Sequence, residues 1–147
     1  MKKIELTLII TFILFLMNSA NADLNMSLKN YLDGKDLEKG STQIYLLKRC
    51  SSVYAYASGI VLKSDAVSSK NFIEISNNLL FKAVELKVIE EEKKLEDAQE
   101  EAEKNRKELF SNYIADGKKN WEKNKSHFKG SYIAEDMVIC SKLTQDN

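Results

Sequence analysis

Two cysteines are the residues of this chain whose type and spacing most directly predict chemistry. Cys50 and Cys140 are the only two cysteines among 147 residues, and about 90 residues separate them. An even cysteine count in an exported chain favours a disulfide, and this spacing is unlike the Cys-x-x-Cys arrangement of redox-active pairs. The alternative is two free buried thiols, which suit an oxidising compartment poorly. In the chain-entropy model a bridge across such a loop contributes roughly 4–5 kcal/mol.

Charged side chains lie next to the predicted bridge. Arg49 directly precedes Cys50. The carboxylates within about one helical turn of Cys140 are those of Glu135 and Asp136. Once a disulfide joins the two segments, Arg49 can form an ion pair with one of these carboxylates. We interpret such a pair as a partly buried contact that fixes the register of two helices, in preference to a ligand site.

The remaining residue types give no catalytic or metal-binding motif. The single histidine, His127, stands in a lysine-rich stretch, whereas structural zinc sites need clusters of Cys and His. Neither a glycine-rich phosphate loop nor the Gly-x-Ser-x-Gly motif occurs. The carboxylates between Glu90 and Glu103 are more typical of a solvated helix surface than of a weak cation site. We therefore expect a protein that is not an enzyme and that needs no metal or cofactor.

A basic and aromatic segment, residues 118–129, is the main candidate for contact with a partner. Trp121 and Phe128 are seven residues apart and would share a face of a helix. The residues expected to contact a partner or a membrane surface are Lys118, Lys119, Trp121, Lys123, Lys125, Phe128 and Lys129. Lysines with Trp and Phe on one helix are typical of segments that bind anionic membranes. The alternative is that the segment folds back onto the acidic run Glu90–Glu103.

The element that must position these residues is a stretch of about residues 69–115, which contains no Gly and no Pro. Apolar residues recur in it at steps of three and four, which predicts a helix. Residues 90–108 are rich in Glu and Lys, both strong helix formers. We expect one long central helix, either straight or bent, or two helices end to end, and a charged segment 90–108 that projects from the bundle or folds back. Asp116 and Gly117 predict its end, because Gly tolerates the left-handed conformation.

Helical spacing also predicts three other helices. They cover residues 23–32, about 42–63 with Ser41 or Thr42 as cap, and 131 to about 143. No pattern of strands is present. The predicted fold class is all-α, a small helical bundle whose first long helix and last helix are joined by a disulfide between Cys50 and Cys140.

The first 22 residues have the pattern of a secretory signal peptide. Lys2 and Lys3 precede an apolar run from Leu6 to Met17, and Ala20-Asn21-Ala22 is a small-x-small cleavage site. The apolar run is shorter than the roughly 20 residues that span a membrane, although an uncleaved anchor is the alternative. We expect a signal peptide over 1–22, a single helical domain over 23–147, and export to the periplasm or the outside of the cell.

Charge and export together narrow the class of function. The chain has 22 basic and 22 acidic residues, so its overall field does not attract nucleic acid. We expect a noncatalytic binding or structural module of the cell envelope, with a protein partner or self-association. The alternative is an envelope- or membrane-associated inhibitor or effector that acts through residues 118–129.

Overall fold

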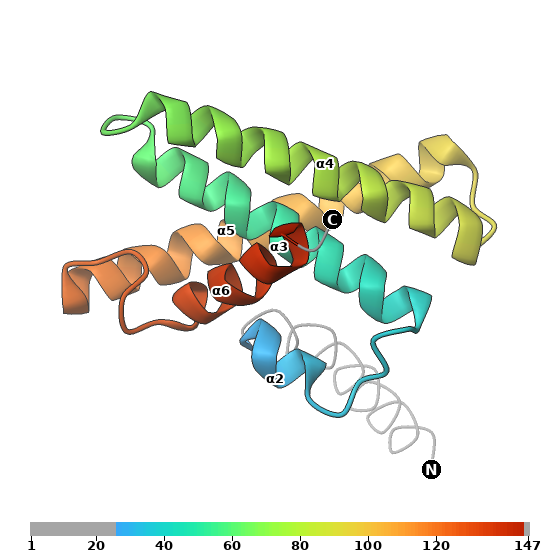
Figure 1. Ribbon diagram of the computed structural model, residues 1–147, viewed down its shortest axis with the longest axis horizontal. Coiled ribbons are helices and arrows are strands. Elements are labelled where there is room, and N and C mark those ends of the chain that lie inside the picture. Colours follow the sequence, from blue (N-terminus) through green and yellow to red (C-terminus); the bar gives the residue numbers. More distant parts are fainter. Residues whose placement is uncertain (1–25, 146–147) are drawn as a thin grey trace, which may run out of the picture.

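The computed structural model describes residues 26–145 of the chain. Within this range the protein is an all-α bundle without strands, as predicted (Figure 1). Its helices are α2 (Leu28–Leu32), α3 (Gly40–Val61), α4 (Ala66–Glu90), α5 (Leu95–Asn124) and α6 (Tyr132–Gln145). The predicted signal peptide, residues 1–22, lies outside the described residues.

Helices α3 and α4 form an antiparallel pair along one side of the bundle (Figure 1). Serines line their contact. Ser51 Oγ donates to the carbonyl oxygen of Ser76 at 2.8 Å, and Ser76 Oγ donates to that of Ser51 at 2.7 Å. Two turns away, Ser58 Oγ donates to the carbonyl oxygen of Ser69 at 2.9 Å. Small side chains let the two backbones approach, and these buried hydroxyls find their partners on the facing helix.

The long central helix expected over about 69–115 is two helices, α4 and α5, which run back along each other (Figure 1). Glu92, at a φ of 50°, lies in the left-handed region between them. The charged segment 90–108 therefore does not project from the bundle. Ala98 and Ala102 of α5 are buried and pack in one apolar cluster with Val84 of α4. Burial of this narrow stripe of small residues outweighs the strong local preference for one continuous helix.

A buried lysine holds the corner between α4 and α5. The side chain of Lys87 is 3% exposed, and its Nζ donates to Glu91 at 2.9 Å and to Glu101 at 3.0 Å. Lys93 forms a further ion pair with Glu101. The hydrogen bonds from Lys93 and Lys87 lower the pKa of Glu101 to about 2. The corner is thus fixed by charges that come from both helices and the turn between them.

The predicted helix end at Asp116 and Gly117 is wrong, because α5 continues to Asn124. Gly117 does not end the helix but allows Tyr56 of α3 to pack closely against α5. A Cβ atom at this position would lie 1.7 Å from the hydroxyl oxygen of Tyr56 on α3. The left-handed residue that ends the helix is Lys125, with a φ of 55°.

The predicted disulfide between Cys50 and Cys140 is confirmed and joins α3 to α6, with a Cα–Cα distance of 5.3 Å. Both cysteines are fully buried in the main apolar core, with Val53, Tyr113 and Ile133. The predicted start of α3 is wrong in detail. The helix begins at Gly40, ahead of Ser41 and Thr42, and neither of them caps it.

Candidate functional site

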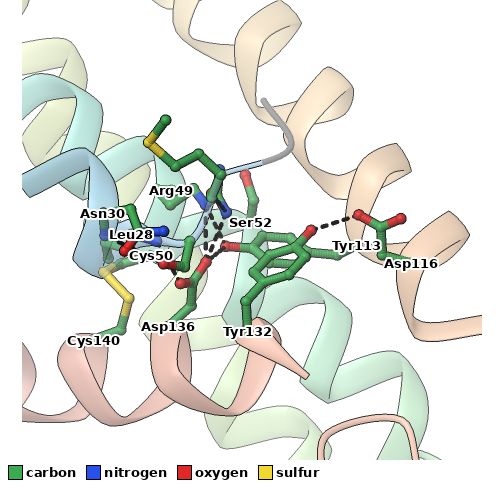
Figure 2. Close-up of polar contacts among 12 residues, drawn as sticks. Leu28, Asn30, Arg49, Cys50, Ser52, Tyr113, Asp116, Tyr132, Asp136 and Cys140 are labelled. Atoms are coloured by element: carbon green, nitrogen blue, oxygen red, sulfur yellow. Dashed lines mark hydrogen bonds and ion pairs between the residues drawn. A yellow bond between two sulfur atoms is a disulfide. The ribbon is translucent and has the colours of Figure 1, made fainter. Parts of the chain in front are cut away.

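A buried polar cluster lies beside the disulfide and contains both partners of the predicted ion pair (Figure 2). Arg49 Nη2 lies 2.9 Å from Asp136 Oδ2, and the two side chains are 1% and 0% exposed. Glu135, the other candidate carboxylate, is exposed. A helix presents consecutive residues about 100° apart, so only one of these two acids can face the core.

Every side-chain nitrogen of Arg49 has a hydrogen-bond partner. Its Nε donates to Tyr113 Oη at 2.7 Å and to Asp136 Oδ2 at 3.0 Å. Its Nη1 donates to Tyr45 Oη at 3.2 Å, and its Nη2 donates to the carbonyl oxygen of Met26 at 2.7 Å. A buried guanidinium needs partners for its donors, and here they come from α3, α5, α6 and the backbone just before α2.

Asp136 is equally well paired. It accepts from the backbone N–H of Leu28 at 2.7 Å and from the hydroxyl of Tyr113 at 2.6 Å. Next to it, the hydroxyl of Tyr132 donates to Asp116 at 2.8 Å (Figure 2). We name Arg49, Tyr45, Tyr113 and Asp136 the arginine cluster. Sequence patterns missed its tyrosines, because a tyrosine at helical spacing predicts core packing and does not identify its hydrogen-bond partner.

The hydrogen bonds of the arginine cluster stabilise the arrangement of the helices. Burial raises the pKa of the Tyr113 hydroxyl well above its usual range, and the neighbouring Asp136 carboxylate adds to this effect. Tyr113 therefore stays protonated and donates. No buried side-chain nitrogen or oxygen within residues 26–145 lacks a hydrogen-bond partner. The cluster thus has no unpaired polar atom directed at a ligand, and it fixes how four helices meet.

The basic and aromatic segment 118–129 does not form a single helical face. The helix ends at Asn124, between its two aromatic residues. Trp121 remains exposed and stacks on His127, whereas Phe128 is half-buried with its ring edge toward Tyr56. The predicted lysines, Lys118, Lys119, Lys123, Lys125 and Lys129, are all exposed. Phe128 is therefore a packing residue, while Trp121 is open to contact.

The alternative that this segment folds back onto Glu90–Glu103 is wrong. Most of both segments lies on one continuous helix, α5, at opposite ends of it. The acidic Glu91 and Glu101 pair with Lys87 and Lys93 instead. Lys119 forms an ion pair with Asp116 at 3.1 Å, and the other lysines of the segment are exposed and can meet another molecule.

One face of α5 collects exposed or half-buried charged and apolar residues along its length. They are Glu96, Glu100, Glu103, Lys107, Phe110, Ile114, Lys118, Trp121 and Lys125, which we name the outward stripe. Their spacing of three or four residues places the eight that belong to α5, from Glu96 to Trp121, on one side of the helix. Lys125 is the left-handed residue that follows the end of this helix. The buried residues of α5, such as Ala102 and Tyr113, lie on another side. This spacing can be read from the sequence, but the predicted helix end at Gly117 assigned its residues to two separate segments.

An apolar groove borders the outward stripe between α3 and α5. It has a volume of about 290 Å³. Its lining residues are Tyr56, Gly59, Ile60, Phe110, Ile114, Lys118, Trp121 and His127. Tyr56 Oη and His127 Nδ1 lie 2.9 Å apart at its base, and burial raises the pKa of Tyr56 to about 12. Ile114 and Trp121 are each 47% exposed at its rim.

Among residues 26–145, no group of three or more His, Cys, Asp or Glu side chains is placed to hold a metal ion. None of the helices described is both long and apolar enough to cross a membrane. In comparisons with known proteins, no family model, no curated protein and no solved structure matches the chain.

Proposed function

We propose that this protein is an exported, noncatalytic binding or structural module of the cell envelope, which contacts its partner through the outward stripe of α5. The observation that carries the proposal is the exposure of Ile114 and Trp121 beside an apolar groove, with Lys118 and Lys125 around them. Exposed apolar patches with a polar rim mark interaction surfaces. Trp is also enriched at the centres of interfaces.

Export is supported by two features of the chain. The pattern of residues 1–22 is that of a signal peptide. The disulfide between Cys50 and Cys140 belongs to the oxidising compartments in which such bonds persist. The first residue of the processed protein tests this part of the proposal. N-terminal sequencing of the exported chain is expected to give Asp23 as the first residue. A chain that keeps Met1 and stays in the cytoplasm would contradict export.

Site-specific photocrosslinking tests the contact surface. A benzophenone amino acid in place of Ile114 is expected to give a covalent protein adduct in an envelope fraction. Phe81 is the matched control, because it is 61% exposed and lines a second apolar groove on α4. Adducts from the Phe81 position and none from Ile114 would transfer the contact surface to α4. Absence of adducts from both positions would reject a protein-binding role for either groove.

A second candidate function is association with an anionic membrane surface, which the exposed Trp121 between Lys118 and Lys125 favours. Flotation with vesicles that contain anionic lipid, at low salt, measures it. Binding that is lost in Trp121→Ser and in Lys118→Glu would support this candidate. A wild-type chain that stays out of the vesicle fraction at low salt would remove it.

A further inference from the structure

Charge is separated along the outward stripe. The N-terminal third of the stripe is acidic, with Glu96, Glu100 and Glu103. The remainder contains only basic and apolar residues, from Lys107 to Lys125. All nine positions are exposed or half-buried. A helix face with opposite charges at its two ends is complementary to the same face turned end to end.

Antiparallel pairing of two copies brings unlike charges together. If the two-fold axis passes between Phe110 and Ser111, each residue faces one equally far on the other side of that axis. Glu103 then faces Lys118 of the second copy, and Glu96 lies opposite the end of the second helix, which Lys125 directly follows. Symmetry repeats both contacts, because the same patch is used on both subunits of a two-fold dimer. Parallel pairing in register would instead oppose Glu to Glu and Lys to Lys.

The apolar residues of the stripe also find suitable neighbours in this register. Ile114 faces Lys107 of the second copy, and Trp121 faces Glu100. The aliphatic stems of Lys and Glu can cover apolar side chains while their charged ends stay in water. Phe110 lies at the axis, where the two copies meet. The 30-residue length of α5 corresponds to roughly 45 Å of helix, so the contact extends over many turns.

We propose that the partner of the outward stripe is a second copy of this chain, docked through antiparallel α5 helices in a two-fold dimer. This inference rests on the proposed function, since it identifies the partner of the same surface. The contact is mainly electrostatic at its two ends. Its strength is therefore expected to fall steeply as salt screens the charges.

Charge exchange tests the register, with analytical ultracentrifugation as the measurement. In low salt the wild-type protein is expected to dimerise at concentrations between about 10 µM and 1 mM, the range of weak protein contacts. Glu103→Lys and Lys118→Glu each place like charges opposite each other twice. Each is expected to weaken dimerisation at least about tenfold. The double variant restores opposite charges and is expected to restore the dimer.

Two controls separate this result from a loss of folding or of net charge. Glu74→Lys reverses an exposed charge on α4 and is expected to leave dimerisation unchanged. Circular dichroism and thermal unfolding of every variant are expected to match the wild type, because the altered side chains are exposed or half-buried. A double variant that stays monomeric would overturn the proposed register.

A cysteine near the proposed axis gives an independent readout. Ser111 is exposed, so under oxidation Ser111→Cys is expected to link two chains covalently, while Asn71→Cys on α4 is not. A wild-type chain that remains monomeric at about 1 mM in low salt would overturn the dimer. If Ile114 then gave adducts with a different protein, the proposed function would stand and only the dimer would be rejected. Absence of any adduct from Ile114 would remove the outward stripe as the contact surface in both proposals.

Discussion

Arg49 shows how a single side chain can connect most of this bundle. Its guanidinium is buried, and it bonds to Asp136, Tyr113, Tyr45 and the backbone of Met26. Burying a charge is costly, and the cost is offset only when every donor and acceptor is paired. In the arginine cluster every side-chain nitrogen of Arg49 and both carboxylate oxygens of Asp136 have a hydrogen-bond partner, so its value lies in specifying one arrangement of helices.

Removal of one charge from this cluster is expected to be strongly destabilising. Asp136→Asn leaves the Arg49 guanidinium buried without its counter-charge and is expected to lower the free energy of unfolding by about 3–5 kcal/mol. The double variant Arg49→Met/Asp136→Leu removes both charges and is expected to cost much less than the sum of the two single changes. Urea unfolding with the disulfide intact measures both.

The matched control for this pair is Glu135→Gln. Glu135 is exposed and precedes Asp136, so its neutralisation is expected to change the free energy of unfolding by less than about 0.5 kcal/mol. Equal effects of Asp136→Asn and Glu135→Gln would show that the buried ion pair contributes nothing specific.

The corner between α4 and α5 predicts a pH dependence. Lys93 and Lys87 lower the pKa of Glu101 from 4.5 to about 2. A carboxylate with a lowered pKa in the folded state adds stability above its unfolded pKa, and that stability is lost as pH falls through the folded pKa. The stabilisation is therefore complete above about pH 5 and gone near pH 2.

Glu101→Gln measures this contribution in urea unfolding at pH 7 and at pH 2. Because Glu101 is 42% exposed, the variant is expected to lose only about 1 kcal/mol at pH 7, and the difference from the wild type should vanish near pH 2. The control Glu108→Gln, an exposed position on the same helix, is expected to change little at either pH. A difference that persists unchanged at pH 2 would contradict the assignment.

Sequence patterns predicted some of these residues and not others, for physical reasons. Cys50 and Cys140 form a covalent constraint, so Arg49 and a carboxylate near Cys140 followed from it. Which carboxylate pairs depends on the rotation of α6, and the bonds of Tyr113 depend on how α5 crosses the core. Both are tertiary features, which local spacing does not encode.

At the scale of the elements, the main difference from expectation is the position of the helix ends. Residues 69–115 contain no Gly or Pro, and residues 90–108 are rich in strong helix formers, so no local signal marks the reversal at Glu92. The reversal is stabilised by partners distant in sequence, such as Glu101 for Lys87. At Gly117 the local signal was present but had a different cause, the approach of Tyr56 to the backbone of α5.

Two helical glycines provide a direct test of this interpretation. Gly117→Ala would place a methyl group against the hydroxyl of buried Tyr56, and the resulting strain is expected to cost about 1–3 kcal/mol. Gly59→Ala on α3 meets no atom within 4 Å and is expected to stabilise the helix by about 0.4–1 kcal/mol. Thermal unfolding compares them. A Gly117→Ala protein as stable as Gly59→Ala would mean that Tyr56 moves aside freely.

At the scale of the whole molecule, covalent and polar contacts converge where α3 meets α6. The disulfide joins these two helices, and the arginine cluster next to it also holds α5 and the start of α2. Helices α4 and α5 lie within the loop that the bridge closes, whereas α2 precedes it and most of its support comes from α6. The bridge therefore constrains the segment from α3 to α6 directly, whereas it constrains α2 only through the contact of α2 with α6.

Reduction of the disulfide is expected to loosen the two ends of the chain before its centre. A closed loop of 90 residues contributes roughly 4–5 kcal/mol in the chain-entropy model, a large part of the stability of a small domain. The urea midpoint is thus expected to fall sharply with reductant, and Cys50→Ala/Cys140→Ala should match the reduced protein. In hydrogen exchange, amides of α6 should lose protection more than those at the Ser51–Ser76 contact between α3 and α4, which has its own hydrogen bonds. Uniform loss of protection would show that the bundle opens as one unit, and an unchanged midpoint would show that packing alone holds α6 in place.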